Sequence, residues 1–314
     1  MDITNNITHF KPCGGNYDKP LEIIYYLLGT CNYNCDYCAW RDLKYKENSF
    51  EIQKQILDNL FKIRKKSNLF LFGGEPTLCT YFKELIEYIF KNKPKSMTVE
   101  LQTHGELNPI IIEQIKKYNI NVSVSIHYNN IKSITKVLKN ILLLNNYNIL
   151  HRIDFMFEEK NIKKQKIFFK MLEDKNLLPV ITPTFGYMNL PDFKKQYSDA
   201  KLLYDSFKDC IEKCKDIEDY EISIDNGDIS IKDASELYQM NLNFNGWKCN
   251  AGSKMVIIDN KGNFNQCTSS YFYDTVKQNI FTNYDRFIKM ITSTSCICKY
   301  TKCNWDLWVD RVKQ

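Results

Sequence analysis

The sequence predicts an α/β fold in which a partial (βα)6 barrel of the TIM type is followed by a small cysteine-rich domain. Three observations predict this class. Short β-rich runs alternate with amphipathic helical stretches from residue 21 to about residue 186, which is typical of βα units on a parallel sheet. One run, INVSVSIHY, has a polar face, and five cysteines follow Trp247. The 314 residues suffice for a sizeable barrel core and an appended domain.

The barrel region is expected to hold six strands with helices between them. The strand ranges are Leu21–Leu28, Asn68–Phe72, Met97–Thr103, Ile120–His127, Ile149–Phe157 and Leu178–Phe185. The helix ranges are Phe50–Lys65, Tyr81–Lys91, Ile110–Tyr118, Ile131–Leu144 and Lys163–Leu172. Six units form an incomplete barrel, because a closed one needs eight.

The chain is expected to divide into four parts. Residues 1–20 are an N-terminal extension, 21–186 the barrel, 187–246 a connector and 247–314 the cysteine-rich domain. The connector predicts a helix over Asp199–Lys215 and a hairpin at EISIDNGDISI, with its turn at Asn226 and Gly227.

Polar residues line one face of several strands. Ser123, Ser125 and His127 alternate with apolar residues, so they share a face, which in a barrel points inward near the end that carries the chemistry of barrel enzymes. The same alternation groups Glu100, Gln102 and His104 on one strand, and Arg152, Asp154 and Glu158 on another. These inward polar groups predict a polar ligand.

The bulk composition excludes some classes of function. The net charge of +6 is scattered along the chain, so no nucleic-acid partner is expected. The chain has no signal pattern and no apolar run long enough to span a membrane, which favours a cytoplasmic protein with no membrane partner. In a reducing compartment, twelve cysteines favour metal ligation over disulfides.

The sharpest motif is GTCNYNCDYCAW, which places Cys31, Cys35 and Cys38 in a loop after the first strand. Three thiolates on a cubane 4Fe-4S cluster leave one iron open to a small molecule. The alternatives are a buried helix stripe or a zinc site with a distant fourth ligand.

A second motif, LFLFGGEPTL, ends the next strand. Gly73 and Gly74 would let a ligand approach the backbone, and Glu75 could accept a hydrogen bond from an ammonium group. The alternative is a simple strand-to-helix turn with Pro76 at the first helical position.

Together the two motifs, with the aromatic Tyr37 before the last cysteine, resemble the radical S-adenosylmethionine superfamily. The resemblance implies that Cys31, Cys35 and Cys38 hold a 4Fe-4S cluster whose open iron binds S-adenosylmethionine. It implies that residues 73–76 recognise the amino group of the cofactor and that Tyr37 lies beside the adenine.

The resemblance continues through QTHG at residues 102–105, which is similar to a QTNG sequence of related enzymes. It implies that Thr103 lies at the cofactor, whereas His104 replaces the usual asparagine. By position, Ser125 and Arg152 resemble residues that contact the ribose and the carboxylate of the cofactor. The alternatives are a satisfied interior hydroxyl for Ser125 and, for Arg152, an ion pair with Asp154 or Glu158.

The second cysteine group begins with Cys249 and Cys267 on either side of a hairpin that turns at Gly262, and continues with Cys296, Cys298 and Cys303. One interpretation of this second cysteine group is a structural zinc site. The spacing also resembles SPASM/twitch domains, which implies one auxiliary 4Fe-4S cluster. The expected ligands are Cys249, Cys267, Cys298 and Cys303, with Cys296 as the alternative to Cys298.

The remaining candidates are single residues. Cys210 and Cys214 share a helical stripe with Leu203 and Phe207, which favours buried core thiols. His127 and Cys79 are candidate catalytic residues, although Cys79 also fits a packing role, and Cys13 is incidental.

The resemblance implies reductive cleavage of S-adenosylmethionine to a 5'-deoxyadenosyl radical that abstracts a substrate hydrogen. The electron donor would be a flavodoxin or ferredoxin. We expect oxidation or epimerisation of a small molecule such as a sugar, a nucleotide sugar or an aminoglycoside-like alcohol, since only 30 residues precede Cys31. The alternatives are a peptide- or protein-modifying maturase and, outside enzymes, a zinc or iron-sulfur binding protein.

Overall fold

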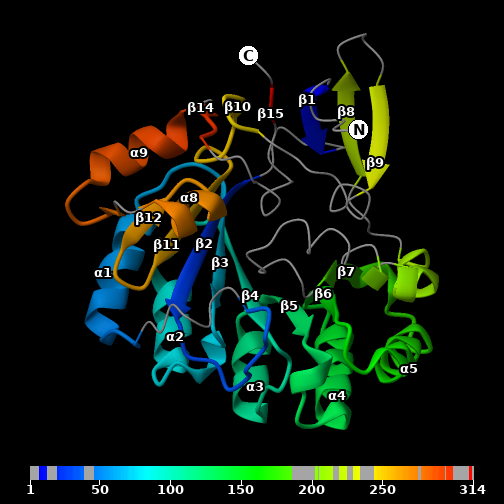
Figure 1. Ribbon diagram of the computed structural model, residues 1–314. Helices are drawn as coiled ribbons and strands as arrows, with labels where there is room; N and C mark the ends of the chain where they lie inside the picture. Colours follow the sequence, from blue (N-terminus) through cyan, green and yellow to red (C-terminus); the bar gives the residue numbers. More distant parts are fainter. Residues whose placement is uncertain are drawn as a thin grey trace.

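A computed structural model describes most of the chain. The described residues are 7–12, 20–38, 46–185, 202–203, 205–214, 219–224, 229–233, 244–274, 277–293, 295–299 and 311–312. Figure 1 shows two sheets, a large one flanked by helices and a small one beyond its end, near both chain termini.

The large sheet confirms the predicted barrel region. Its strand order is β13-β12-β11-β2-β3-β4-β5-β6-β7, and β2 to β7 run parallel in chain order. The six parallel strands are β2 (Leu21–Leu28), β3 (Ser67–Gly73), β4 (Met97–Thr103), β5 (Asn121–Ile126), β6 (Leu150–Phe157) and β7 (Ile181–Phe185). The partial (βα)6 barrel of the TIM type is therefore the fold of this region.

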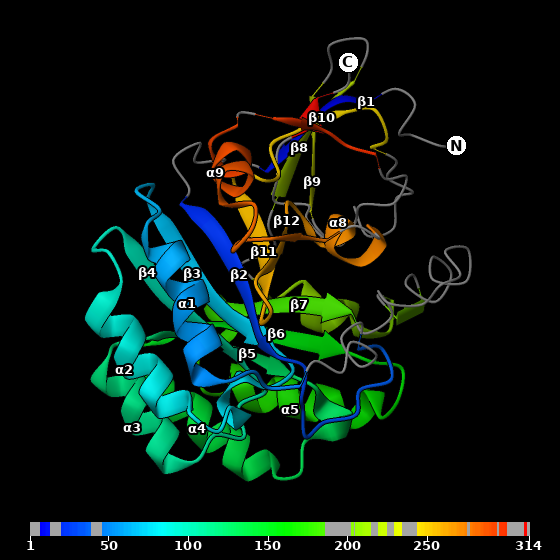
Figure 2. The same ribbon diagram turned by 90° about the vertical axis from the view of Figure 1, so that its left-hand side faces the viewer.

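Five helices cover the outer face of these strands (Figure 2). They are α1 (Phe50–Phe61), α2 (Phe82–Asn92), α3 (Pro109–Lys117), α4 (Ile134–Asn146) and α5 (Ile162–Glu173). Short polar side chains start three of them, because Ser49, Asn108 and Ser133 each accept a backbone N–H of the first turn. Asn119 and Asn148 follow α3 and α4 with left-handed backbone, a position that asparagine tolerates.

Three predicted boundaries were wrong by three residues or more. The first helix was expected to reach Lys65 but ends at Phe61, where Lys62 forms the C-cap. The last barrel strand begins at Ile181 because Leu178–Val180, which contains Pro179, forms a 3-10 turn. The fourth helix begins at Ile134 because Ser133 caps it, and the preceding segment holds a second 3-10 turn, Tyr128–Asn130.

Alternating residues of the barrel strands face opposite sides. Ile23, Tyr25 and Leu69 belong to the fully buried set that packs under the helices. The other face carries Ser123 and Gln102, both buried, and points to the barrel interior as the alternation predicts.

The small sheet joins segments from three parts of the chain in the order β14-β10-β15-β1-β8-β9. Its strands are β1 (Ile7–Pro12), β8 (Asp219–Ile224), β9 (Ile229–Asp233), β10 (Lys248–Cys249), β14 (Cys296–Ile297) and β15 (Arg311–Val312). The predicted hairpin is present as β8 and β9, while its turn residues Asn226 and Gly227 lie outside the described residues. The sequence did not predict β1, which lies between β15 and β8.

The C-terminal region also extends the large sheet. β11 (Met255–Asp259) pairs in parallel with β2, from Met255 opposite Glu22 to Asp259 opposite Tyr26. β12 (Asn263–Asn265) and β13 (Gln278–Asn279) continue the sheet in antiparallel pairs. α8 (Thr268–Tyr273) and α9 (Tyr284–Thr292) accompany them.

Two other features concern helices. The connector helix is described at residues 202–203 and 205–211. Among the described residues, the helices are all too short or too polar to cross a lipid bilayer.

Candidate functional site: the cysteine loop and the barrel interior

The three cysteines of the first motif lie in the loop that follows β2. The Cys31 residue is exposed, Cys35 is buried and Cys38 is partly buried, and none of the three forms a disulfide within the described part of the chain. Burial raises the pKa of Cys35 to about 12 and also raises that of Cys31. A metal must therefore displace protons from these sulfurs.

The loop already directs hydrogen-bond donors at sulfur. The backbone N–H of Tyr33 donates to Cys31 Sγ over 3.4 Å, and Tyr37 contributes a hydrogen bond that lowers the pKa of Cys35 against the effect of burial. Such donors stabilise thiolates and are usual around iron-sulfur ligands. Three thiols in one short loop with donors at sulfur therefore fit an iron-sulfur cluster.

The three cysteine side chains are not arranged around one common point. In the described part of the chain, no three His, Cys, Asp or Glu side chains converge closely enough to hold a single metal ion. The ligands of a cubane cluster bind separate iron atoms, so a cluster does not require that convergence.

The Gly-Gly-Glu-Pro turn packs directly on the start of the cysteine loop. The Gly74 N–H donates to the Leu28 carbonyl over 2.7 Å, and the Glu75 N–H donates to the Thr30 carbonyl over 2.8 Å. A Cβ on Gly74 would lie 2.1 Å from the Thr30 oxygen, and one on Gly73 would lie 2.3 Å from the Leu28 oxygen. The close neighbour that these glycines admit is thus protein backbone, whereas the sequence suggested a ligand.

The carboxylate of Glu75 is buried and accepts hydrogen bonds from protein donors on both oxygens. One oxygen accepts the hydroxyls of Thr77 at 2.6 Å and Thr103 at 2.9 Å. The other accepts the backbone N–H of His104 at 2.9 Å. Glu75 thereby ties the end of β3 to the end of β4, and Thr103 belongs to the same network.

Tyr37 and His127 meet beside the cysteine loop. Their rings stack with centroids 5.8 Å apart, and the Tyr37 hydroxyl lies 2.7 Å from His127 Nδ1. Burial, together with the nearby His104, lowers the pKa of His127 to about 4, so its ring is neutral at pH 7. The same hydroxyl lies 3.4 Å from Glu158, which Asn129 also contacts.

Ser125 and Arg152 belong to a polar network on the interior face of β4, β5 and β6. The Gln102 amide donates to the Ser125 hydroxyl and, over 3.0 Å, to Asp154. Arg152 forms an ion pair with Asp154, with Nε 2.9 Å from Oδ1. Both residues thus have the protein partners that the sequence offered as alternatives.

A second polar layer lies nearer the beginning of the strands. The Asn68 amide donates to Glu22 over 3.1 Å and to Glu100 over 3.3 Å. Glu100 also accepts hydrogen bonds from Ser123 and His151, which outweigh burial and lower its pKa. The sequence reasoning missed Glu22 and Asn68, although each lies one residue into its strand on the polar alternation.

The second cysteine group gathers around the start of the small sheet. Strand pairing places Cys249 directly opposite Cys296. The Cys249 thiol and burial raise the pKa of Cys296, and Cys267 and Cys298 raise it further. Cys267 also caps α8, since its sulfur accepts the Ser270 N–H over 3.3 Å. Cys303 lies outside the described residues.

The other cysteines lie in apolar surroundings. Cys210 and Cys214 are buried in the same core cluster as Leu203 and Phe207, as predicted. Cys79 belongs to that core cluster too, and burial, together with Glu47, raises its pKa. Cys13 lies outside the described residues.

Comparisons with known proteins agree with the fold and the first motif. Residues 25–156 match the family model of the radical SAM superfamily. An uncharacterized protein of Methanocaldococcus jannaschii is 29% identical over 169 residues, which are 49% of this chain and 59% of that protein. This chain therefore matches about three fifths of that relative's length.

Two solved structures resemble this chain in fold. The structure of anSMEcpe with bound AdoMet has a TM-score of 0.58 and 19% identity, covering 88% of this chain and 80% of that chain. The structure of Streptococcus suis SuiB bound to the precursor peptide SuiA has a TM-score of 0.57 and 14% identity, covering 91% and 72%.

Proposed function

We propose that this chain is a radical SAM enzyme in which Cys31, Cys35 and Cys38 hold a 4Fe-4S cluster that binds S-adenosylmethionine, since residues 25–156 match the family model of that superfamily. One observation carries the proposal. The Gly-Gly-Glu-Pro turn is joined to the end of β2 and the start of the cysteine loop by two backbone hydrogen bonds of 2.7 and 2.8 Å, which supports a single site for both motifs.

When bound, the cluster and S-adenosylmethionine supply a 5'-deoxyadenosyl radical that abstracts a hydrogen atom from the substrate. The residues of this chain bind and orient. Tyr37 would lie beside the adenine, residues 73–76 and Thr103 would recognise the amino group, and Ser125 and Arg152 would contact the ribose and the carboxylate. A flavodoxin or ferredoxin is the proposed electron donor.

The substrate we favour is a polar small molecule, such as a sugar, a nucleotide sugar or an aminoglycoside-like alcohol, which is oxidised or epimerised. The support is the polar character of the interior wall of the barrel, which carries Gln102, Ser125 and Asp154.

A peptide is the second candidate substrate. The observation that favours it is the likeness in fold to SuiB, whose structure contains the precursor peptide SuiA. This likeness concerns the fold, so the identity of the substrate is decided by experiment.

We further propose an auxiliary 4Fe-4S cluster on Cys249, Cys267, Cys298 and Cys303, with Cys296 as the alternative ligand. The clustering of Cys249, Cys267, Cys296 and Cys298 supports such a site, and the position of Cys296 opposite Cys249 supports the alternative. The chemistry of four thiols suits iron-sulfur ligation.

The test is anaerobic reconstitution with iron and sulfide. The wild-type protein should take up about eight irons, and the triple variant Cys31→Ala, Cys35→Ala, Cys38→Ala about four. Cys210→Ala, in the core, is the control and should keep all of them. Reduction in the presence of S-adenosylmethionine should yield 5'-deoxyadenosine with the wild type and none with the triple variant.

Candidate substrates are then compared by deuterium transfer. Deuterium from the reacting carbon should appear in 5'-deoxyadenosine, with a labelled sugar alcohol for the first candidate and a labelled peptide for the second. Zinc in place of iron, or a cluster-loaded protein that forms no 5'-deoxyadenosine, would contradict the proposal.

A further inference from the structure

Four aromatic rings form a column between the cysteine loop and the barrel strands. Their order is His104, Tyr33, His127, Tyr37. The Tyr33 ring stacks on His104 with centroids 4.1 Å apart and a 17° angle, and it meets His127 edge-on at 6.2 Å. Rings from the loop thus alternate with rings from the ends of β4 and β5.

The two tyrosines of the column alternate with the three cysteines along the chain. Tyr33 lies between Cys31 and Cys35 in the chain, and Tyr37 lies between Cys35 and Cys38. Contacts that fix these two rings therefore also restrain the short backbone segments that carry the thiols, because each tyrosine is within two residues of two cysteines.

The hydrogen bonds of the His104 ring indicate which of its two nitrogens carries the proton. Its Nδ1 accepts the backbone N–H of Glu106 over 3.1 Å, which places the proton on Nε2. From there the ring donates to Asn32 Oδ1 over 2.7 Å. His104 therefore holds two consecutive residues of the loop, Asn32 by a hydrogen bond and Tyr33 by stacking.

The histidine itself is firmly supported. Its side chain is 6% exposed, and its backbone N–H donates to the buried carboxylate of Glu75 over 2.9 Å. Glu75 in turn is bound to the Thr30 carbonyl through its own N–H. The hydrogen bonds that hold His104 in place therefore lead through Glu75 back to the start of the cysteine loop.

We propose that His104 is a positioning residue that holds the cysteine loop in its cluster-binding form. This inference rests on the proposed function, because that function gives the loop its cluster. The contacts of His104 with Asn32 and Tyr33, however, are present in the protein without iron. An asparagine at this position could keep a hydrogen bond to Asn32 but would offer no ring to Tyr33.

The first experiment measures amide hydrogen exchange in the iron-free full-length protein. His104→Asn removes the ring, His104→Phe keeps a ring but removes the hydrogen bond, and His151→Asn is the matched control away from the loop. Exchange in the peptide covering residues 31–38 should be about tenfold faster in His104→Asn. It should be a few-fold faster in His104→Phe and unchanged in His151→Asn.

The second experiment uses the iron-loaded protein. The EPR signal of the reduced cluster and the rate of iron loss to a chelator should change in His104→Asn and His104→Phe but not in His151→Asn. The loop sets the positions of the three sulfur ligands, and these positions determine both properties.

The outcomes separate the two proposals. Unchanged loop exchange in both His104 variants overturns the positioning role, and so does an equal acceleration in α4, which would mean a general loss of stability. A wild-type protein that takes up no iron would count against the proposed function, while the exchange comparison would still decide the role of His104.

Discussion

Glu22 carries its carboxyl group on the interior face of β2, where Asn68 donates to both of its oxygens. Burial, followed by repulsion from Glu100, raises its pKa from 4.5 to about 7. The neighbouring Glu100 behaves in the opposite way, because hydrogen bonds from His151 and Ser123 overcome its burial and lower its pKa. One proton is thus retained in this layer by Glu22 near neutral pH.

The replacement Glu22→Gln tests this description. The folded protein keeps the Glu22 proton to about pH 7, whereas the unfolded chain loses it near 4.5, so wild-type stability falls as the pH rises between these values. Glu22→Gln cannot ionise and should be more stable than the wild type at pH 8, by about 1–3 kcal/mol, and equal to it at pH 4.

Urea unfolding at the two pH values measures the difference. Glu84→Gln, at an exposed position of α2, is the control and should show little pH-dependent gain. A gain for Glu22→Gln that is the same at both pH values would contradict the assigned pKa.

The Gly-Gly-Glu-Pro turn and the cysteine loop behave as one element, although about forty residues separate them in the chain. Sequence alternation predicted which strand residues face inward, since the period of a strand is fixed by its backbone. It did not predict that Gly74 meets Thr30, because an approach between two loops depends on the register of β2 and β3. For the same reason the sequence did not predict the stacking of the four aromatic rings, although all four residues belong to the motifs described above.

The substitution Gly74→Ala should disrupt this element. Its Cβ would lie 2.1 Å from a backbone oxygen, so the cysteine loop must move. We expect loss of most iron from the first cluster and a destabilisation of about 2–4 kcal/mol. Iron analysis and thermal unfolding measure the two effects.

Gly246→Ala is the matched control. Gly246 has a left-handed φ of 85° but no atom within 4 Å of an added Cβ, so only backbone strain of about 1 kcal/mol is expected. Iron content equal to that of the wild type in Gly74→Ala would show that the contact with Thr30 is dispensable.

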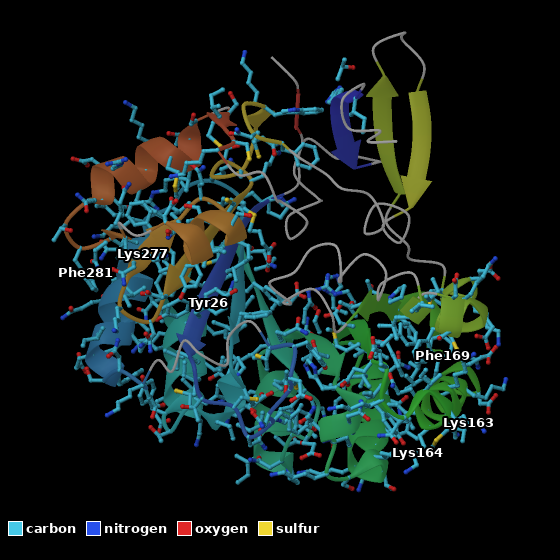
Figure 3. All side chains as sticks on the ribbon, viewed as in Figure 1. Tyr26, Lys163, Lys164, Phe169, Lys277 and Phe281 are labelled. Atoms are coloured by element: carbon cyan, nitrogen blue, oxygen red, sulfur yellow. The ribbon has the colours of Figure 1, made fainter. Side chains whose placement is uncertain are left out.

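The large sheet unites the two ends of the chain. β11 extends the barrel at β2, and α8 places Tyr271 on Tyr26 with ring centroids 5.3 Å apart. In Figure 3, Tyr26 and Lys277 lie on this side of the sheet, and Phe169 lies on α5 at the other side. The cysteines after Trp247 indicated a separate C-terminal region, but only the structure reveals the parallel pairing, because residues 233 positions apart carry no local signal of their contact. The N-terminal strand β1 was missed for the same reason.

Ile258→Ala tests whether the barrel and the C-terminal strands unfold together. Ile258 is fully buried and belongs to the same core cluster as Leu27 and Ile56. The truncation should cost about 2–5 kcal/mol, and hydrogen exchange in α1 should accelerate along with that in β11.

Ile167→Ala removes the same atoms from a side chain that is 62% exposed and should change stability by less than about 0.5 kcal/mol. Slow exchange in α1 together with fast exchange in β11 would mean that the two parts unfold separately.

The pairing of β11 with β2 also bears on how the chain is made. Leu28 leaves the ribosome 227 residues before Met255, as the two residue numbers show. At synthesis rates of about 5–20 residues per second, the hydrogen-bonding edge of β2 waits roughly 10–45 s for its partner. During that time it offers unpaired N–H and C=O groups to other chains. Newly made protein should therefore depend on chaperones that shield this edge until β11 has emerged.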